Sequence, residues 1–223
     1  VVQDHLKTET YSYKKILCGL LFEIQNKIFS SLALLENSKA DKKEINEIKE
    51  FCIHELELNL SGDFENMQLT EKKKYLFSEL NRPIRVCGMV VNEGHPGGGP
   101  FWIKDNDRRI SKQVIETTQI DLKDPNQKMI LESATHFSPV DLVCAIKSYK
   151  GEKFNLKKFI DPDSGQITIK SYEGKELKAL ELPGLWNGGM AKWISVFVEV
   201  PKITFTPVKE VNDLLKEEHQ SQY

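Results

Sequence analysis

Apolar side chains recur at every third or fourth position between residues 13 and 35. This spacing places them along one side of an α-helix of about seven turns. The stripe consists of Ile16, Leu17, Leu20, Leu21, Ile24, Ile28, Leu32 and Leu35. The same periodicity predicts a second amphipathic helix over residues 42–58 and a shorter helix over residues 70–80. Residues 1–80 are therefore expected to form a helical segment.

The pattern changes after Asn81, where Pro83 ends the last of these helices. Residues 84–91 are apolar on both sides, which is typical of a central strand in a covered sheet. Asp124, Pro125 and Gln127 predict a helix start with a capping box. Further strands are expected over residues 101–103, 113–120, 139–146, 166–171 and 195–200, and helices over residues 125–133, 156–160, 183–193 and 208–216. Because strands and helices alternate, residues 81–223 are predicted to be an α/β region with a mixed, mainly buried sheet.

The composition is that of a folded globular protein without a specialised charge balance. Among 223 residues, 31 are Lys or Arg and 33 are Asp or Glu, so the formal net charge is −2. A nucleic-acid partner is not expected, since proteins that bind nucleic acid carry a basic face. No run of about 18 apolar residues occurs, and a membrane-spanning helix is not expected either.

The four cysteines lie in apolar runs and form no CxxC pair. They are Cys18, Cys52, Cys87 and Cys144. We expect buried free thiols in a reducing, cytoplasmic compartment, and no zinc site. The first residue is Val1 rather than Met, and no signal peptide follows it. The chain is expected to lack its natural beginning.

Three consecutive glycines, Gly97, Gly98 and Gly99, form the most conspicuous loop. Such a loop can bring its backbone N–H groups close to a phosphate. It leads into Phe101 and Trp102 rather than into a helix, and it matches neither a P-loop nor a dinucleotide-binding motif. A loop that contacts a ligand and a flexible hairpin or lid are both consistent with this pattern.

Several polar residues have both a structural and a functional interpretation. His95 begins the glycine loop, and His136 lies between a predicted helix and strand. Glu116 and Asp141 lie in or near apolar strands, where a carboxylate needs either an internal salt bridge or a ligand. Lys209 follows an extended segment, where it is either a surface lysine or a phosphate-binding one. Trp102, Trp186 and Trp193 are expected to be core or lid residues.

Three segments together resemble UDP-sugar pyrophosphorylases. They are residues 114–120, residues 134–143 and, most specifically, residues 200–215. Nearly the whole chain also resembles the C-terminal part of an uncharacterised bacterial family, a domain of unknown function. That second resemblance rests on residues 85–90, 97–102 and 180–188.

The resemblance implies a partial GT-A fold, the fold of nucleotide-diphospho-sugar transferases, with N-terminal helices in front of it. The nucleotide loop and the metal-binding Asp would belong to a preceding half, so the implied Mg²⁺ cofactor would have its ligand outside this chain. The implied partner is a nucleotide sugar or a sugar phosphate. Lys209 would contact its phosphates as the catalytic residue. The resemblance places Gly88 and Glu116 in the sugar pocket, and it places His136 and Ser138 where the pyrophosphorylases have Asn. The glycine loop has no clear counterpart in these enzymes, and Gly97, Gly98 and Gly99 are added as substrate-binding candidates from the loop sequence itself.

The function expected from this resemblance is that of the C-terminal portion of a nucleotide-sugar pyrophosphorylase-like protein, inactive alone. It requires Lys209 and Glu116 to face one crevice. One alternative is a non-catalytic module that binds a nucleotide sugar or phosphosugar. Another is a structural or interaction domain, which an exposed apolar stripe between Ile16 and Leu35 would favour. The base, the sugar and the oligomeric state are left open by the sequence.

Overall fold

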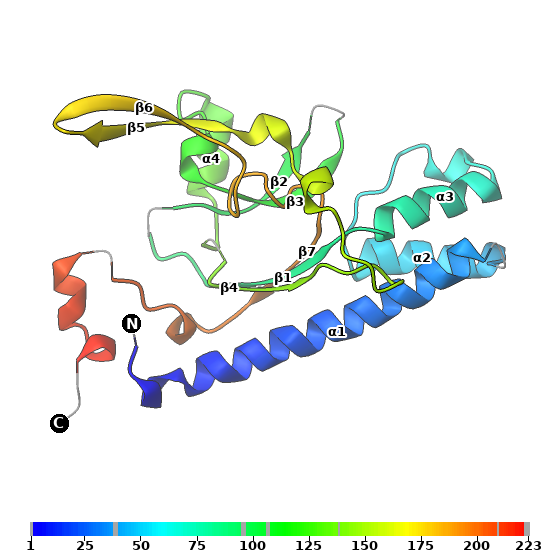
Figure 1. Cartoon of the computed structure of the whole chain (residues 1–223), viewed down its shortest axis with the longest axis horizontal. Coiled ribbons are helices and arrows are strands. Elements are labelled where there is room, and N and C mark those ends of the chain that lie inside the picture. The colour runs from blue at the N-terminus through cyan, green and yellow to red at the C-terminus, as the bar shows by residue number, and fades with distance from the viewer. Residues whose placement is uncertain are drawn as a thin grey trace.

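The computed structural model of the chain describes residues 2–37, 40–94, 97–105, 108–137, 139–208 and 210–220. It has a mixed α/β fold that begins with helices, as predicted (Figure 1). Its helices are α1 (Thr8–Glu36), α2 (Lys42–His54), α3 (Leu69–Leu80) and α4 (Pro125–Glu132). Its strands are β1 (Ile84–Met89), β2 (Gly99–Lys104), β3 (Ile110–Ile115), β4 (Asp141–Ala145), β5 (Gln166–Tyr172), β6 (Lys175–Glu181) and β7 (Ile194–Glu199). Single 3-10 turns, among them Leu156–Phe159 and Val211–Leu215, replace two of the expected helices.

The centre of the fold is a three-stranded mixed sheet in the order β4-β1-β7. Strand β1 pairs antiparallel with β4 and parallel with β7, and all six of its residues are buried. Its alternate side chains enter two separate cores, because successive residues of a strand point to opposite faces. Ile84 and Val86 belong to the large core under α1, whereas Cys87 and Met89 belong to a small core with Val114 of β3. The prediction of a central, covered strand is confirmed.

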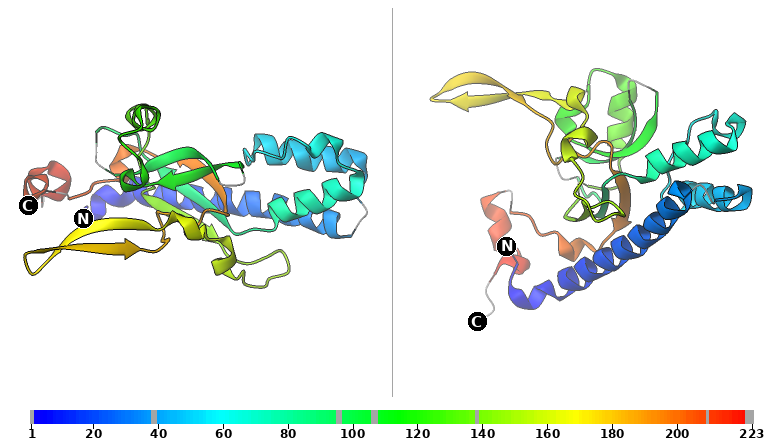
Figure 2. Two further views of the ribbon diagram at one scale, coloured as in Figure 1. Left: turned by 90° about the horizontal axis from the view of Figure 1, so that it is seen from above. Right: turned by 45° about the vertical axis from the view of Figure 1, so that its right-hand side comes forward.

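Helix α1 crosses one face of this sheet, with α2 and α3 packed at one end of it (Figures 1 and 2). Six of the eight residues of the predicted apolar stripe are buried, namely Leu17, Leu21, Ile24, Ile28, Leu32 and Leu35. They share one core with α3 and β1. The stripe is therefore mainly an internal packing surface. It is not the exposed apolar stripe that would have favoured a structural or interaction domain.

By length and composition alone, the helical segment Asp4–Glu36 could cross a membrane. This differs from the expectation drawn from the sequence. It is weak evidence for a membrane span, because a core helix and an N-terminal signal sequence both pass the same test. Helix α1 packs on β1, β4 and α3, which is the arrangement of a core helix, although Ile16 and Phe22 are exposed on its outer side.

The second face of the sheet is covered by the β2–β3 hairpin, whose Val114 packs against Cys87 and Met89 of β1 (Figure 1). A second hairpin, β5–β6, extends away from the rest of the molecule in every view (Figure 2). Strand β6 was not predicted. The expected helix over residues 183–193 is wrong, because this glycine-rich segment folds into a loop around the buried Asn187. The Asn187 side chain accepts a hydrogen bond from the Gly184 N–H at 2.7 Å.

Three smaller expectations are also corrected. Strand β3 ends at Ile115 rather than at residue 120, because Glu116 and Gln119 form a reciprocal capping box around a 3-10 turn. Asp124 does cap α4, but the Gln127 side chain accepts from the N–H of Asp121 and not from the cap residue. The four thiols are free, and only Cys52 and Cys87 are buried; Cys18 and Cys144 are exposed.

Candidate functional site

A hollow of about 500 Å³ lies beyond the carboxyl end of β1, where the glycine loop meets the end of β3. The segment after α4 forms a second wall, since the N–H of Phe137 donates to the Val90 carbonyl just after β1. Ligands of open α/β sheets commonly bind beyond the carboxyl ends of parallel strands. The described residues that line this hollow, called the glycine-loop hollow below, are Gly97, Gly98, Glu116, Thr117, Thr118, Phe137, Pro139 and Trp186.

The glycines are required by close packing. A Cβ at Gly98 would lie 2.0 Å from the carbonyl oxygen of Ile115, and one at Gly99 would lie 2.7 Å from that of His136. Gly97 has φ +145° and lies against the ring of Phe137. The described part of the loop is thus fixed against β3 and the segment after α4. Of the two interpretations that the sequence left open, this close packing disfavours the flexible hairpin or lid, and it holds two of the three glycines at the wall of the hollow.

Glu116 lies at the rim of the same hollow, directly after β3. Its side chain caps the following 3-10 turn, and one carboxylate oxygen accepts a long hydrogen bond, 3.5 Å, from the Gln166 amide. Gln166 also accepts from the Thr118 hydroxyl at 2.7 Å. These bonds hold the carboxylate in place, and a carboxylate has about four acceptor positions, so it can still accept hydrogen bonds from a ligand.

Two aromatic rings complete the wall of the hollow. Phe137 contacts Gly97 on one side and the ring of Phe205 on the other, with centroids 5.2 Å apart. Trp186 packs against the small core that contains Met89 and is carried by the loop around Asn187. The hollow therefore combines apolar rings, one carboxylate and two threonine hydroxyls. From its sequence position Trp186 is predicted only to be a core or lid residue, because its place in the hollow depends on the fold of that loop.

The structure brings some of the expected site residues together and separates others. Gly97, Gly98 and Glu116 share the hollow, and Gly99 lies next to it as the first residue of β2. Gly88 is on the opposite face of the sheet, where an added Cβ would lie 3.1 Å from Leu17 of α1. Gly88 therefore allows the helix to pack closely and does not line the hollow.

The His136 ring is engaged away from the hollow. Its Nε2 lies 2.9 Å from a carboxylate oxygen of Glu199, at the end of β7, and its Nδ1 lies 2.9 Å from the Thr135 hydroxyl. The backbone of His136, in contrast, supports Gly99. Asp141 has the salt bridge that is one of its two expected roles, 3.4 Å from Lys14.

Three residues of the sequence interpretation lie outside the described residues: Lys209, Ser138 and His95. The required proximity of Lys209 and Glu116 is therefore still a prediction. The neighbouring Pro139 does line the hollow.

Comparison with known proteins identifies the family. The sequence matches the family described as "Domain of unknown function (DUF4301)" over residues 1–220. The chain belongs to this family. The family description assigns no activity to the DUF4301 domain.

Two other comparisons add little. No curated protein matches the sequence. Among solved structures, a mutant UDP-glucose pyrophosphorylase from Leishmania major, in complex with UDP-glucose, is similar with a TM-score of 0.39 and 13% identity. The alignment covers 67% of this chain and 33% of that one, so this chain spans about a third of that enzyme.

The described residues of this DUF4301 domain do not by themselves fit the magnesium ion that the resemblance implies. Magnesium prefers oxygen ligands, commonly one or two carboxylates together with substrate phosphates. Within the described ranges, no group of three or more His, Cys, Asp or Glu side chains could hold a metal ion. Glu116 is the one carboxylate among the described lining residues of the hollow, and it already caps a turn.

Proposed function

We propose that the glycine-loop hollow binds the sugar of a nucleotide sugar or sugar phosphate, and that the DUF4301 protein transfers a nucleotidyl group to a sugar phosphate. The observation that carries the proposal is the meeting of Glu116, Trp186 and the glycine loop at one hollow. Sugar hydroxyls donate hydrogen bonds to a fixed carboxylate, and the C–H face of a pyranose packs on an aromatic ring. A mostly apolar wall with few polar groups is usual for small-molecule sites.

The phosphates need a cation, and the described lining of the hollow contains none. We assign this role to Lys209, because the resemblance places it against the phosphates of the nucleotide sugar and a lysine is a compact charge for them. In the proposed reaction, a phosphate oxygen of the sugar phosphate forms a bond to the α-phosphorus of a nucleoside triphosphate. The bond to the β-phosphate oxygen breaks, and pyrophosphate leaves with the electron pair. This chemistry depends on positioning and charge neutralisation.

Binding is tested by titrating the protein with UDP-glucose, glucose 1-phosphate and UDP in a calorimeter. Glu116→Gln is expected to weaken the binding of UDP-glucose about tenfold, since one charge-assisted hydrogen bond contributes roughly 1.5 kcal/mol. Glu176→Gln, on the exposed strand β6, is the matched control and is expected to leave it unchanged. Thermal unfolding of both variants separates loss of binding from loss of fold. Equal affinities for the two variants would contradict the sugar site.

The contribution of the aromatic wall has its own matched pair. Trp186→Phe removes part of the wall of the hollow, whereas Trp102→Phe changes a ring that is 57% exposed on β2. We expect the first substitution to weaken UDP-glucose binding severalfold and the second to have no effect. The same calorimetric titration measures both.

Transfer is tested on the complete reading frame, by measuring pyrophosphate release from nucleoside triphosphates with a panel of sugar phosphates. Lys209→Ala is expected to abolish turnover, with Lys175→Ala of the exposed hairpin as the control. Nucleotide-sugar binding without turnover would instead support a non-catalytic binding module. If the protein shows neither binding nor turnover, both functions are refuted.

A further inference from the structure

A second cleft lies at the other end of β3, between the C-terminus of α3 and the start of β7. Its volume is about 340 Å³. Among the described residues, five cationic side chains line it against three carboxylates. The cations are Arg82, Arg109, Lys112, Lys158 and Lys192, and the acids are Glu57, Glu79 and Asp105. We call this the basic cleft.

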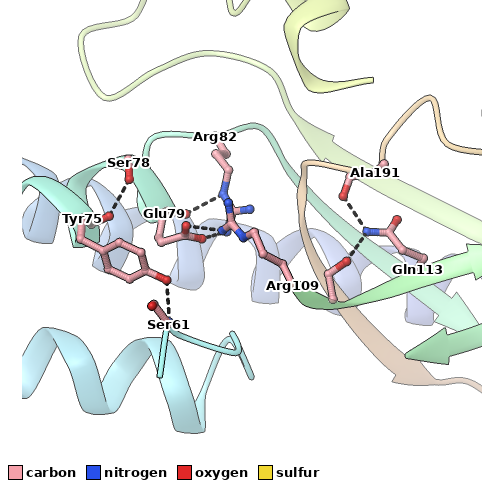
Figure 3. Close-up of polar contacts among 9 residues, drawn as sticks. Ser61, Tyr75, Ser78, Glu79, Arg82, Arg109, Gln113 and Ala191 are labelled. Atoms are coloured by element: carbon pink, nitrogen blue, oxygen red, sulfur yellow. Dashed lines mark hydrogen bonds and ion pairs between the residues drawn. The ribbon is translucent and has the colours of Figure 1, made fainter. Parts of the chain in front are cut away.

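One carboxylate, that of Glu79, organises the wall on the α3 side (Figure 3). Glu79 is buried and forms ion pairs with Arg82, at 3.0 Å, and with Arg109 of the β2–β3 turn. Arg109 is half exposed and so presents guanidinium N–H groups beyond this pair. Lys112 pairs with Glu57 at 2.7 Å. Lys158 and Lys192 have no acidic partner within the described part of the chain. The described lining of the cleft therefore has an excess of positive charge.

A buried arginine behind the cleft adds to this excess. Arg85 of β1 is 2% exposed, and its guanidinium donates to the Ser195 hydroxyl at 2.7 Å and to the Gln113 side chain at 3.3 Å. Ser195 itself lines the cleft. No carboxylate among the described residues pairs with Arg85, and a buried charge without a counter-charge is costly. Burial lowers the pKa of Arg85 for this reason. An anion in the cleft would reduce that cost.

Two further wall residues have unused hydrogen-bonding groups. The indole Nε1 of Trp193 and the side-chain oxygen of Asn81 are buried and without a hydrogen-bond partner among the described residues. Trp193 is 6% exposed. Such groups are uncommon in folded proteins. Both atoms are closed to solvent, so a ligand would reach them only after a small movement of the cleft wall.

We propose that the basic cleft binds a small phosphate monoester that carries hydroxyl groups, of the size of a hexose phosphate. The lysines and Arg109 would contact the phosphate, and a small movement of the wall would let the Asn81 oxygen accept from a hydroxyl. The volume, at the low end for ligand sites, suits a hexose phosphate better than a whole nucleotide sugar. This site is separate from the glycine-loop hollow, because the length of β3, about 17 Å, lies between them.

The test follows the indole signal of Trp193 in ¹⁵N–¹H spectra while glucose 6-phosphate is added. A saturable shift of the Trp193 signal is expected, and glucose, the same molecule without the phosphate, is expected to give none. Inorganic phosphate is expected to shift the signal with lower affinity. The Trp186 signal reports the glycine-loop hollow in the same spectrum, so failure at one site is distinguished from failure at the other.

Substitution of the two unpaired lysines is the decisive variant experiment. Lys158→Ala and Lys192→Ala are each expected to weaken glucose 6-phosphate binding about fivefold, since each removes one charge-assisted contact. Both are exposed and should fold normally, as should the control, Lys175→Ala. The proposal would be overturned if millimolar glucose 6-phosphate gave no saturable shift. It would also be overturned if a variant with both Lys158→Ala and Lys192→Ala bound glucose 6-phosphate as tightly as the control.

Discussion

The two ends of strand β3 offer two different kinds of site. At the Glu116 end, the hollow is shaped by backbone, because Gly98 approaches the Ile115 carbonyl too closely for any side chain. At the Ile110 end, the basic cleft is shaped by charge, with Glu79 buried between Arg82 and Arg109. The first site depends on glycines, which have no side chains, and the second depends on ion pairs between acidic and basic side chains. Substitutions at the two ends should therefore fail for different reasons.

The largest effect is expected at the charged end. Glu79→Gln removes the carboxylate and leaves Arg82, which is largely buried, without its partner. Breaking a buried ion pair on one side costs about 3–5 kcal/mol, so urea unfolding should show a loss in this range. Glu47→Gln, in the exposed pair with Lys43, is the control and should leave the free energy of unfolding unchanged within error. A loss no larger than that of the control would mean that Glu79 does not organise the cleft.

Gly98→Ala tests the backbone end. The added Cβ meets a main-chain oxygen rather than a movable side chain, so we expect a loss of roughly 2–3 kcal/mol in the free energy of unfolding. Gly62→Ala introduces a Cβ with nothing within 4 Å and should be neutral or slightly stabilising. Chemical denaturation of both variants measures the difference. A tolerated Gly98→Ala would show that the loop can move away from β3.

Two buried thiols, one near each site, are expected to make the stability of the protein depend on pH. Burial raises the pKa of Cys52, near Glu79, and of Cys87, beneath Trp186, each to about 12. In the unfolded chain a thiol ionises near pH 8.5 to 9, while in the folded chain these two stay protonated. The contribution of each thiol to the free energy of unfolding is therefore complete below pH 9. It is lost as the pH rises from about 9 to about 12, by about 1.4 kcal/mol per pH unit per thiol.

Chemical denaturation at several pH values, on the parent and on Cys52→Ala and Cys87→Ala, isolates this contribution from that of Lys and Tyr. Each variant should lose stability less steeply above pH 9 than the parent. Identical slopes would show that the thiol is hydrated in the folded protein.

Exposed Cys18 should react with a thiol reagent in the native protein, whereas Cys52 should react only on unfolding.

The smallest effect is expected from His136. Its ring faces Glu199 rather than the hollow, so His136→Asn should leave the affinity for UDP-glucose unchanged. The calorimetric titration used for Glu116→Gln measures this directly. A marked loss of affinity would return His136 to the sugar site and would require its ring to turn away from Glu199.

Local signals in the sequence predicted most of the fold. The apolar stripe of α1 and the uninterrupted apolar run of β1 both depend on periodicity, and both are confirmed. The loop around Asn187 could not be predicted in this way, because its shape depends on a buried amide that bonds backbone groups. The strand β6 was missed because four of its seven residues are charged and it forms an exposed hairpin with β5.

The site was predicted in part. The glycine loop and Glu116 were chosen by residue type, and they do meet. Gly88 was placed on the wrong face of the sheet, since the family likeness gave its position along the chain but not its side of β1. The basic cleft was missed because its charges come from α3, the β2–β3 turn and the segment before β7, which only the tertiary fold assembles.

The most direct test of the proposed function is the set of indole signals in a ¹⁵N–¹H spectrum of the protein during titration with UDP-glucose. The signals are assigned with the Trp186→Phe and Trp102→Phe variants. A sugar in the glycine-loop hollow should shift the Trp186 signal saturably and leave that of the exposed Trp102 in place. A Trp186 signal that stays unchanged while calorimetry shows binding would place the ligand elsewhere and contradict the sugar site.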